Sequence, residues 1–218
     1  MKVSTRSLPA LAVLAALTIP ATAFAHPHIF AEARLELETS ADGQITELRH
    51  VWRFDEVFSS SVMLDFDRNG DFVLDNSELA SISEVVTDSL SDFDYYTSLT
   101  IDGADGSISL PDPIKVSFQD GQLLMFFAVL PKEPLPLDGT IAVGVLDPTM
   151  YAAIEFVTDD DMVVTGASAD RCSRRVIRPD PDEVIAQNQG SLTEAFFSDP
   201  TGNDISKLFA TRLELDCK

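Results

Sequence analysis

Positive charge is scarce in this sequence of 218 residues. Lysine and arginine together number 15, aspartate and glutamate number 36, and the formal net charge at pH 7 is −21. Such a chain repels the phosphates of nucleic acids and the surfaces of anionic membranes, so we expect neither as a partner. The same charge suits cations as ligands and an extracytoplasmic setting.

Long apolar runs are also rare, and the only one lies at the start of the chain. Two basic residues precede an apolar stretch at residues 8–19, and Ala23-Phe24-Ala25 forms a small-x-small cleavage pattern. The stretch is too short to span a bilayer comfortably, because a span takes about 20 apolar residues. We therefore expect a signal peptide at residues 1–25 and a soluble periplasmic protein that begins at His26. The mature chain, 26–218, is expected to form a single domain.

Only two cysteines are present, Cys172 and Cys217, and both remain after export. In an oxidising compartment the default expectation is a disulfide between them. It would close a loop of about 45 residues, which is worth roughly 4 kcal/mol in the chain-entropy model. The alternative, a thiolate metal site, lacks further ligands at close spacing.

Motifs of common enzymes are absent. The sequence has no Gly-x-Ser-x-Gly nucleophile elbow, no phosphate-binding loop and no paired-cysteine redox motif. Carboxylates are so numerous that adjacent pairs such as Asp55 and Glu56 carry almost no information about acid–base catalysis. We therefore predict that the protein is not an enzyme.

Apolar and polar residues alternate in the first part of the mature chain. This pattern predicts half-buried strands at residues 29–37 and 44–54, joined by a hairpin turn at Ala41-Asp42-Gly43. Apolar residues then recur every three or four positions, which predicts helices at 55–66 and 76–93. Further strands are expected at residues 97–102, 107–110, 114–118, 122–130, 140–146, 150–157, 162–167 and 211–217, and short helices near 182–189, 192–197 and 204–210.

These elements predict an α+β fold, in which an EF-hand-like helix-loop-helix at about residues 55–93 is inserted into an antiparallel β-rich domain. Asp102-Gly103, Asp120-Gly121 and Asp138-Gly139 mark turns between the later strands. The proline-rich connector at 131–138 is the best candidate for an internal boundary.

The loop between the two predicted helices has the spacing of a calcium-binding loop. Counted from Asp67 as position 1, oxygen ligands fall at positions 1, 3, 5, 7, 9 and 12. These positions are held by Asp67, Asn69, Asp71, Val73 (through its backbone carbonyl), Asp75 and Glu78. Position 6 is Phe72, where a glycine is expected for the sharp turn.

Two alternatives stay open for this loop. A register that starts at Asp65 would place Gly70 at position 6, but Asn76 would then replace the closing glutamate. The other alternative is an acidic turn between two helices without a metal. Asp75 and Glu78 form a capping box that would start the second helix in either case.

The three histidines, His26, His28 and His50, are candidate ligands for a transition metal. After signal cleavage His26 would also carry the α-amino group. A square-planar amino-terminal copper or nickel site is excluded, because it needs a deprotonated amide at position two and Pro27 has no N–H. A histidine brace for copper stays open, and so does a histidine–carboxylate site for zinc, nickel or cobalt.

The position of each histidine in the predicted hairpin separates the candidates. In an extended chain, Glu32 points to the same side as His26 and His28. His50 lies beside Trp52 on a predicted core face, which favours a structural role for its ring. It would join the site only if the hairpin placed it opposite His28.

Several segments, in a fixed order, resemble a known family. They are His26-Pro27-His28-Ile29-Phe30, Arg49-His50-Val51-Trp52-Arg53-Phe54-Asp55-Glu56, Tyr95-Tyr96 and Leu146-Asp147-Pro148-Thr149-Met150-Tyr151, with the acidic loop among them. This order resembles the family catalogued as domain of unknown function 1007, over essentially the whole mature chain. Members are commonly described as periplasmic, substrate-binding-type components of ABC-type transport systems associated with nickel/cobalt-type membrane transporters. The family usually carries glycine where this chain has Phe72.

The resemblance also directs attention to particular positions. By position it implies six candidate site residues: His26, His28, His50, Asp55, Asp147 and Tyr151. The leading hypothesis is therefore an exported accessory of a membrane transporter, which binds nickel, cobalt, zinc or copper near the mature N-terminus. The expected ligands are His26, His28, His50, Glu32, Asp55 and Asp147.

Two further hypotheses stay beside the leading one. The second is a calcium-stabilised module for protein interaction, and the third is a copper enzyme with an amino-terminal histidine brace. Under the leading hypothesis, neutral imidazoles bind the metal, so we expect the metal affinity to fall below about pH 6.

Overall fold

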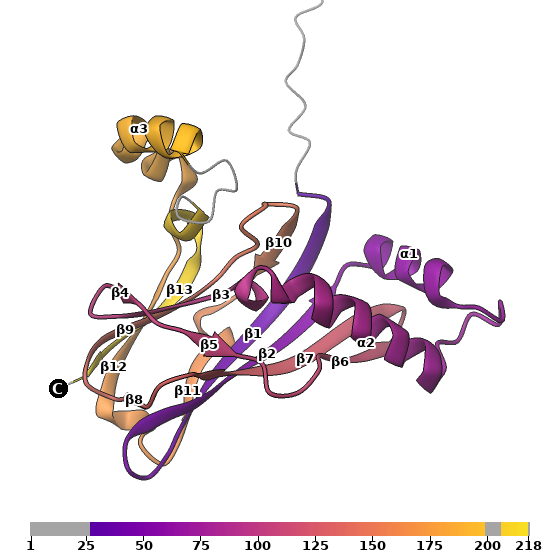
Figure 1. Cartoon of the computed structure of the whole chain (residues 1–218), viewed down its shortest axis with the longest axis horizontal. Helices are drawn as coiled ribbons and strands as arrows, with labels where there is room; N and C mark the ends of the chain where they lie inside the picture. Colours follow the sequence, from indigo (N-terminus) through magenta and orange to yellow (C-terminus); the bar gives the residue numbers. More distant parts are fainter. Residues whose placement is uncertain (1–26, 199–205, 218) are drawn as a thin grey trace, which may run out of the picture.

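The computed structural model describes residues 27–198 and 206–217, which form two β-sheets with helices at the periphery (Figure 1). The strands of the larger sheet are β1 (Ile29–Thr39), β2 (Gln44–Phe54), β5 (Ile108–Ser109), β6 (Lys115–Gln119), β7 (Gln122–Pro131), β8 (Leu135–Pro136), β10 (Ala152–Glu155) and β11 (Met162–Gly166). Their order is β10-β1-β2-β7-β5, and β11, β6 and β8 pair with β1, β7 and β2 respectively. Most pairs are antiparallel, whereas β10 and β11 both run parallel to β1.

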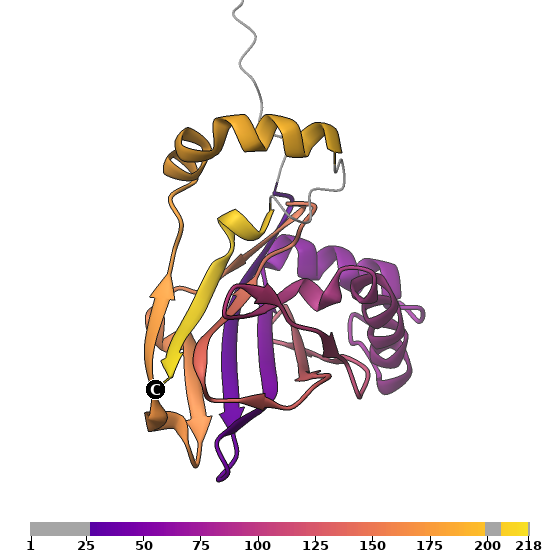
Figure 2. The same ribbon diagram turned by 60° about the vertical axis from the view of Figure 1, so that its left-hand side comes forward.

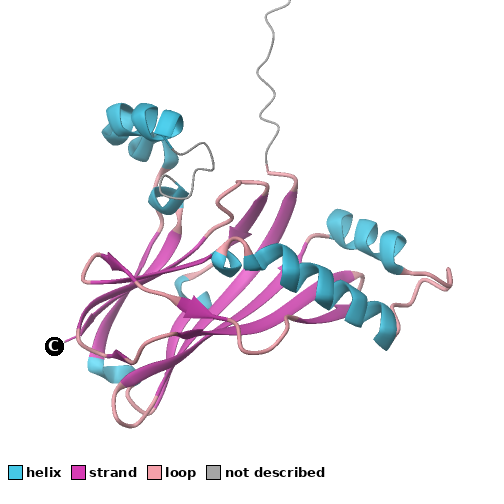
Figure 3. Ribbon diagram, in the orientation of Figure 1, coloured by secondary structure: helices cyan, strands magenta, loops and turns pink. Residues whose placement is uncertain are grey.

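The second sheet has five strands and is antiparallel throughout. Its strands are β3 (Thr97–Ile101), β4 (Ala104–Asp105), β9 (Gly139–Val145), β12 (Cys172–Ile177) and β13 (Thr211–Cys217), in the order β12-β13-β9-β3-β4. The α+β, strand-rich and largely antiparallel class predicted from the sequence is thus confirmed (Figure 3). The predicted internal boundary falls on the connector that holds β8, which leads from the larger sheet to β9 of the second sheet.

The predicted hairpin forms between β1 and β2, with Leu35 opposite His50 and Ala31 opposite Phe54. Alternate residues of β1 are buried, as the sequence pattern predicts, and the residues between them face outward. The turn between the strands uses Gly43 with φ +78°, a left-handed conformation that glycine adopts without a steric cost.

One hydrophobic core lies between the two sheets (Figure 2). From the larger sheet it takes the inward residues of β1, β2 and β7, including the fully buried Leu35, Trp52 and Leu123. From the second sheet it takes residues such as Ile141 and Leu213, which are also fully buried. Alternation along each strand therefore leaves one apolar face per sheet, and the two faces bury each other.

Helices α1 (Glu56–Phe66) and α2 (Asn76–Ser91) lie together at one end of the larger sheet (Figure 1). They contact each other, and they contact β7 and β6 respectively. Hydroxyls of both helices bond to this part of the chain: Ser59 Oγ accepts the N–H of Leu123 in β7 at 2.9 Å. Thr87 Oγ1 accepts the N–H of Ile114, just before β6, at 3.0 Å, and Ser83 Oγ donates to the carbonyl of Ile114. The predicted helix-loop-helix therefore forms. That it is an EF-hand, which binds calcium in its loop, stays a prediction.

The end of α2 differs from the sequence prediction. The helix stops at Ser91, two residues before the predicted end, and the 3₁₀ turn η1 (Asp94–Tyr96) follows after Asp92 and Phe93. All three residues of η1 have a positive φ, which the sequence pattern does not predict.

The C-terminal part contains helix α3 (Pro181–Ser198), the 3₁₀ turn η4 (Lys207–Phe209) and strand β13. Two short helices predicted near residues 182–197 form the single helix α3, which is interrupted by non-helical angles at Asn188. The predicted disulfide is confirmed: Cys172 and Cys217 face each other across β12 and β13, with their Cα atoms 4.3 Å apart. None of the helices in the described ranges is long and apolar enough to cross a membrane.

Candidate functional site

Segments that are far apart in the sequence meet at the start of β1. His28 directly precedes this strand, and its backbone N–H donates to the carbonyl of Tyr151 at 2.8 Å. The two side-chain rings lie next to each other, with centroids 4.9 Å apart. Of the predicted ligands, His26 lies outside the described residues, so His28 is the histidine that marks this end of the sheet.

Asp147 organises the segment that approaches β1 from the other side. Its carboxylate is fully buried. Oδ1 accepts the N–H and the hydroxyl of Thr149 at 2.8 and 2.7 Å, and Oδ2 accepts the N–H of Ala152 at 2.8 Å. Tyr96 also hydrogen-bonds to it. These bonds hold residues 147–152 in place beside His28, so the Asp147 carboxylate has a structural role here.

The contact with Asp147 affects the ionisation of the Tyr96 phenol. Burial raises its pKa above the ordinary value, and the negative charge of Asp147 raises it further. The phenol therefore stays protonated and donates to the carboxylate. Its ring also stacks against Trp52, with centroids 6.0 Å apart, so the buried carboxylate is connected to the core of β2.

Asp55 joins the beginning of β1 to the beginning of α1. Its Oδ1 accepts the N–H groups of Val57 and Phe58, both at 2.9 Å, as the N-cap of the helix. Its Oδ2 accepts the N–H of Phe30 at 3.0 Å. Burial opposes ionisation of this carboxyl, but the backbone hydrogen bonds outweigh it, and its pKa lies below the ordinary value. Asp55 therefore stays anionic close to His28.

Two other predicted ligands lie away from this cluster. Glu32 forms an ion pair with Arg53 and is four residues beyond His28, about 13 Å along an extended chain. His50 lies opposite Leu35, so about 20 Å of strand separates it from the start of β1, and its side chain points into the core.

His50 has the surroundings of a structural residue. Its ring is buried, stacks on Phe127 with centroids 4.5 Å apart, and lies edge-on to Trp52. Thr97 Oγ1 donates to the carbonyl of Tyr95, so the Nε2 atom of His50, 3.3 Å away, is the donor in their contact. Burial lowers the pKa of His50 to about 3, and the imidazole is neutral at any physiological pH.

The structure thus brings His28, Asp55, Asp147 and Tyr151 to one end of the larger sheet and keeps Glu32 and His50 apart from it. Within residues 27–198 and 206–217, no three His, Cys, Asp or Glu side chains converge on a common point suited to a metal ion. A transition metal at the start of β1 would therefore use His28 together with groups that precede it in the chain or come from outside.

The acidic loop has its own internal order. Asp67 Oδ2 accepts the N–H of Phe72 at 2.8 Å, and its Oδ1 accepts that of Gly70 at 2.8 Å. Asn69 and Asp71 accept the N–H groups two residues further on, at 2.8 and 2.9 Å. The side chains at positions 1, 3 and 5 are thereby each bonded to the backbone of the loop.

The closing glutamate ties both ends of the same loop together. Glu78 is buried, and its two oxygens accept the N–H groups of Arg68 and Asp75 at 2.8 and 2.9 Å. Asp75 accepts the N–H of Glu78 in return, which completes the predicted capping box. Phe72 at position 6 has φ +60°, the left-handed conformation for which glycine is expected there.

Sequence reasoning missed the part that Tyr96 plays. Its phenol contacts Asp147 from a turn some fifty residues earlier in the chain, and no local sequence pattern predicts such a contact. The bond between Asp147 and Thr149, by contrast, follows a local rule. An aspartate that accepts from the residue two positions on is a known turn former, and the Asp-Pro-Thr segment carries that signal.

Fold and sites together define an acidic, two-sheet α+β protein with a polar cluster at the start of its central strand and a helix–loop–helix beside it. The sequence model of a family described as "Protein of unknown function (DUF1007)" matches residues 11–217. The chain therefore belongs to this family. No curated protein matches the sequence.

Proposed function

We propose that the protein is an exported metal-binding accessory of a membrane transport system, and that it binds a transition metal through His26 and His28. The observation that carries the proposal is the meeting of separate segments at the start of β1. The His28 segment, the Asp55 cap and the loop from Asp147 to Tyr151 all lie there. These are the same segments on which the family resemblance rests.

A site with only two imidazole ligands suits a protein that transfers its metal ion to a partner. Two imidazoles fill half of a tetrahedral site, and the remaining positions fall to water, to the α-amino group of His26 or to a partner. Asp55 and Asp147 are held by hydrogen bonds within the fold, so they contribute negative charge nearby rather than direct ligands. A site with open positions releases its ion more readily than a closed structural site.

The surroundings of His28 also suit a docking partner. Phe30, Met150 and Tyr151 are 53%, 42% and 47% exposed, which is unusual for large apolar side chains. A transporter subunit that covered them would approach the bound metal directly. Docking and metal transfer would then occur at one place.

A metal titration of the correctly processed protein tests the proposal. Nickel, cobalt, zinc and copper are titrated by calorimetry into the wild type, into the double variant His26→Ala with His28→Ala, and into Glu78→Gln as a control for the acidic loop. We expect the double variant to lose at least about tenfold in affinity for the bound metal and Glu78→Gln to lose none. Equal affinities in all three proteins would overturn the assignment.

A second variant separates two kinds of site. An additional alanine before His26 removes its α-amino group from the required position, so it abolishes a copper brace but only weakens a site made of imidazoles. Mass spectrometry of the native protein would give the amino terminus and the bound metal together.

We propose calcium binding by the acidic loop as a second candidate function, in which the helix-loop-helix is a calcium-stabilised interaction module. The side chains at positions 1, 3 and 5 accept backbone N–H groups of the loop, and Phe72 adopts the left-handed conformation at position 6; both features favour it. Exposed apolar side chains also gather on this insert. Among the described residues, six of the twelve large apolar side chains that are exposed lie between positions 57 and 93: Val57, Leu64, Phe72, Val73, Val85 and Phe93.

Thermal unfolding with calcium tests this candidate. Calcium at about 100 times its dissociation constant would stabilise the native state by roughly 2.7 kcal/mol, whereas magnesium at the same ionic strength would do much less. Glu78→Gln is expected to abolish this gain, because glutamine can keep the capping box but not bind calcium through two carboxylate oxygens. The double histidine variant is the matched control and should keep the full response. No calcium-specific shift in the wild type would reject the module.

A further inference from the structure

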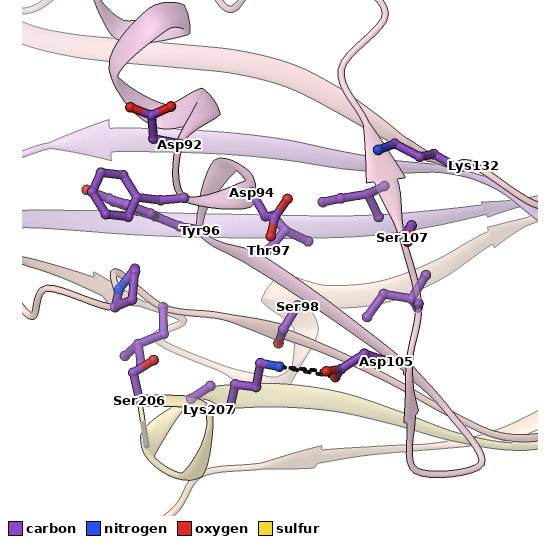
Figure 4. A pocket seen from close by; sticks show the side chains of 17 residues that line it. Asp92, Asp94, Tyr96, Thr97, Ser98, Asp105, Ser107, Lys132, Ser206 and Lys207 are labelled. Atoms are coloured by element: carbon purple, nitrogen blue, oxygen red, sulfur yellow. Dashed lines mark hydrogen bonds and ion pairs between the residues drawn. The ribbon is translucent and has the colours of Figure 1, made fainter. Parts of the chain in front are cut away.

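A polar cleft is bordered by Leu146 and Pro148, the two neighbours of Asp147 in the chain, and neither His28 nor the acidic loop lines it. Its volume is about 370 Å³, within the range of small-molecule sites. Walls come from η1, from the β4–β5 region, from the end of β7 and from η4. Ten of its seventeen lining residues carry hydroxyl, carboxylate or ammonium groups (Figure 4).

One wall of the cleft has an unusual backbone. Asp94, Tyr95 and Tyr96 follow one another with φ angles of +47°, +52° and +56°. Left-handed backbone costs a side-chain-bearing residue roughly 1–2 kcal/mol, so three in succession need support from the fold. Non-glycine strain of this kind gathers at ligand sites, where it orients particular groups.

The support for this turn is visible. The N–H of Tyr96 donates to the carbonyl of Phe93, and its carbonyl accepts the N–H of Leu146, both at 2.9 Å. Its phenol is held by Asp147 on the far side. The turn is therefore fixed at both ends, and its first residue, Asp94, is presented at the cleft.

Charges of both signs line the cleft. Lys207 and Asp105 form an ion pair at 3.1 Å (Figure 4). Lys132, at the end of β7, and Asp94, in η1, have side chains with no ion-pair partner in the described part of the chain. Lysine is rare here, with five in the whole chain, and two of the five line this one cleft.

We propose that this cleft binds a small zwitterion of the size of an amino acid or dipeptide. Its carboxylate contacts Lys132, and its ammonium group contacts Asp94. The hydroxyls of Ser98 and Ser107 line the same cleft and offer further hydrogen-bond partners. A ligand with only one charge would leave the other side chain unmatched, so discrimination depends on carrying both.

Binding to metal-depleted wild-type protein is measured by calorimetry with individual amino acids and with glycylglycine. Acetate and methylammonium serve as probes that carry one charge each. We expect at least one zwitterion to bind at millimolar concentration or below, and neither single-charge probe to match it. Absence of binding by every zwitterion, or equally tight binding of acetate, would overturn the proposal.

Two substitutions locate the binding. Lys132→Gln and Asp94→Asn are each expected to weaken it about tenfold or more, because each removes one charged hydrogen-bond partner. Asparagine is among the residues that tolerate positive φ, so Asp94→Asn keeps the turn. Lys115→Gln, on β6 outside the cleft, is the matched control and should leave affinity unchanged. If neither substitution weakens binding, the assignment to this cleft is wrong, and the double histidine variant should bind as the wild type does.

Discussion

His50 is a predicted metal ligand that the structure keeps in the core. The sequence placed it beside Trp52 on a core face, and its ring is fully enclosed by aromatic side chains and Thr97. A metal ligand must be reachable, and this imidazole is not. Its burial has a consequence for stability instead.

We expect the free energy of unfolding to fall as the pH is lowered from 7 to 5. Burial lowers the pKa of His50 to about 3 in the folded state, whereas an unfolded histidine titrates near 6.5. The unfolded state therefore binds a proton first, so stability is complete above about pH 6.5 and declines below it. The loss is about 2 kcal/mol between pH 7 and 5, and urea unfolding at several pH values measures it.

His50→Gln is the control for this pH dependence. Glutamine can still donate to Thr97 but does not titrate, so the variant should be less stable at pH 7 and show a flatter decline toward pH 5. The prediction fails if wild type and variant decline in parallel over this window.

Phe72 is a second residue whose backbone conformation should affect the stability of the protein. Its φ of +60° is unfavourable for a side chain, and the ring is 71% exposed, so little burial compensates for it. We expect Phe72→Gly to stabilise the calcium-free protein by about 0.5–1 kcal/mol, which is the relief of left-handed strain less the greater unfolded-state entropy of glycine. Calcium affinity should rise as well, because position 6 then turns without strain.

Phe72→Ala separates strain from the loss of the ring. Alanine keeps the Cβ atom and so keeps the strain, and this variant should gain nothing in urea unfolding. Equal gains in both variants would attribute the effect to the exposed ring instead.

At the scale of elements, the sequence pattern predicted the features that depend on neighbouring residues. The alternation in β1 and β2 and the capping box of α2 are written in neighbouring residues, and both are found where the sequence places them. The parallel pairing of β1 with β10 and β11 is different. Those strands come more than a hundred residues later, and their patterns do not encode which strand they join.

The disulfide between β12 and β13 links two strands, and its contribution to the free energy of unfolding can be predicted. It closes a 45-residue separation that includes α3, so reduction should release a large part of the C-terminal chain in the unfolded state. Replacing Cys172 and Cys217 by alanine together is expected to lower the free energy of unfolding by about 4 kcal/mol. Urea unfolding with and without a reducing agent measures it.

The double alanine variant also serves as its own control. A reductant should destabilise the wild type to a similar degree and leave the variant unaffected. If reduction does not change the wild-type midpoint, the chain-entropy contribution of this bond has been overestimated.

At the scale of the whole molecule, the candidate sites show what a sequence can and cannot reveal. The acidic loop was visible from spacing, because all of its oxygen atoms come from twelve consecutive residues. The cluster at the start of β1 was visible only as separate motifs, since Tyr96 and Asp147 meet only because β3 pairs with β9 in the second sheet. The polar cleft proposed to bind a zwitterion left no sequence signal, because only the topology of the fold brings Asp94 and Lys132 to the same cleft.

Net charge leads to a prediction for the entire chain. With 36 acidic and 15 basic residues, the folded state concentrates negative charge, and its self-repulsion outweighs exposed ion pairs such as Arg34–Glu36, each worth at most about 1 kcal/mol. Raising sodium chloride from roughly 10 mM to 150 mM shortens the screening length from about 30 to 8 Å. We therefore expect the melting temperature to rise by on the order of a few degrees, equally with potassium chloride and in Glu78→Gln. A melting temperature that falls with salt would mean that the surface ion pairs, and not the excess charge, dominate the electrostatic free energy of the fold.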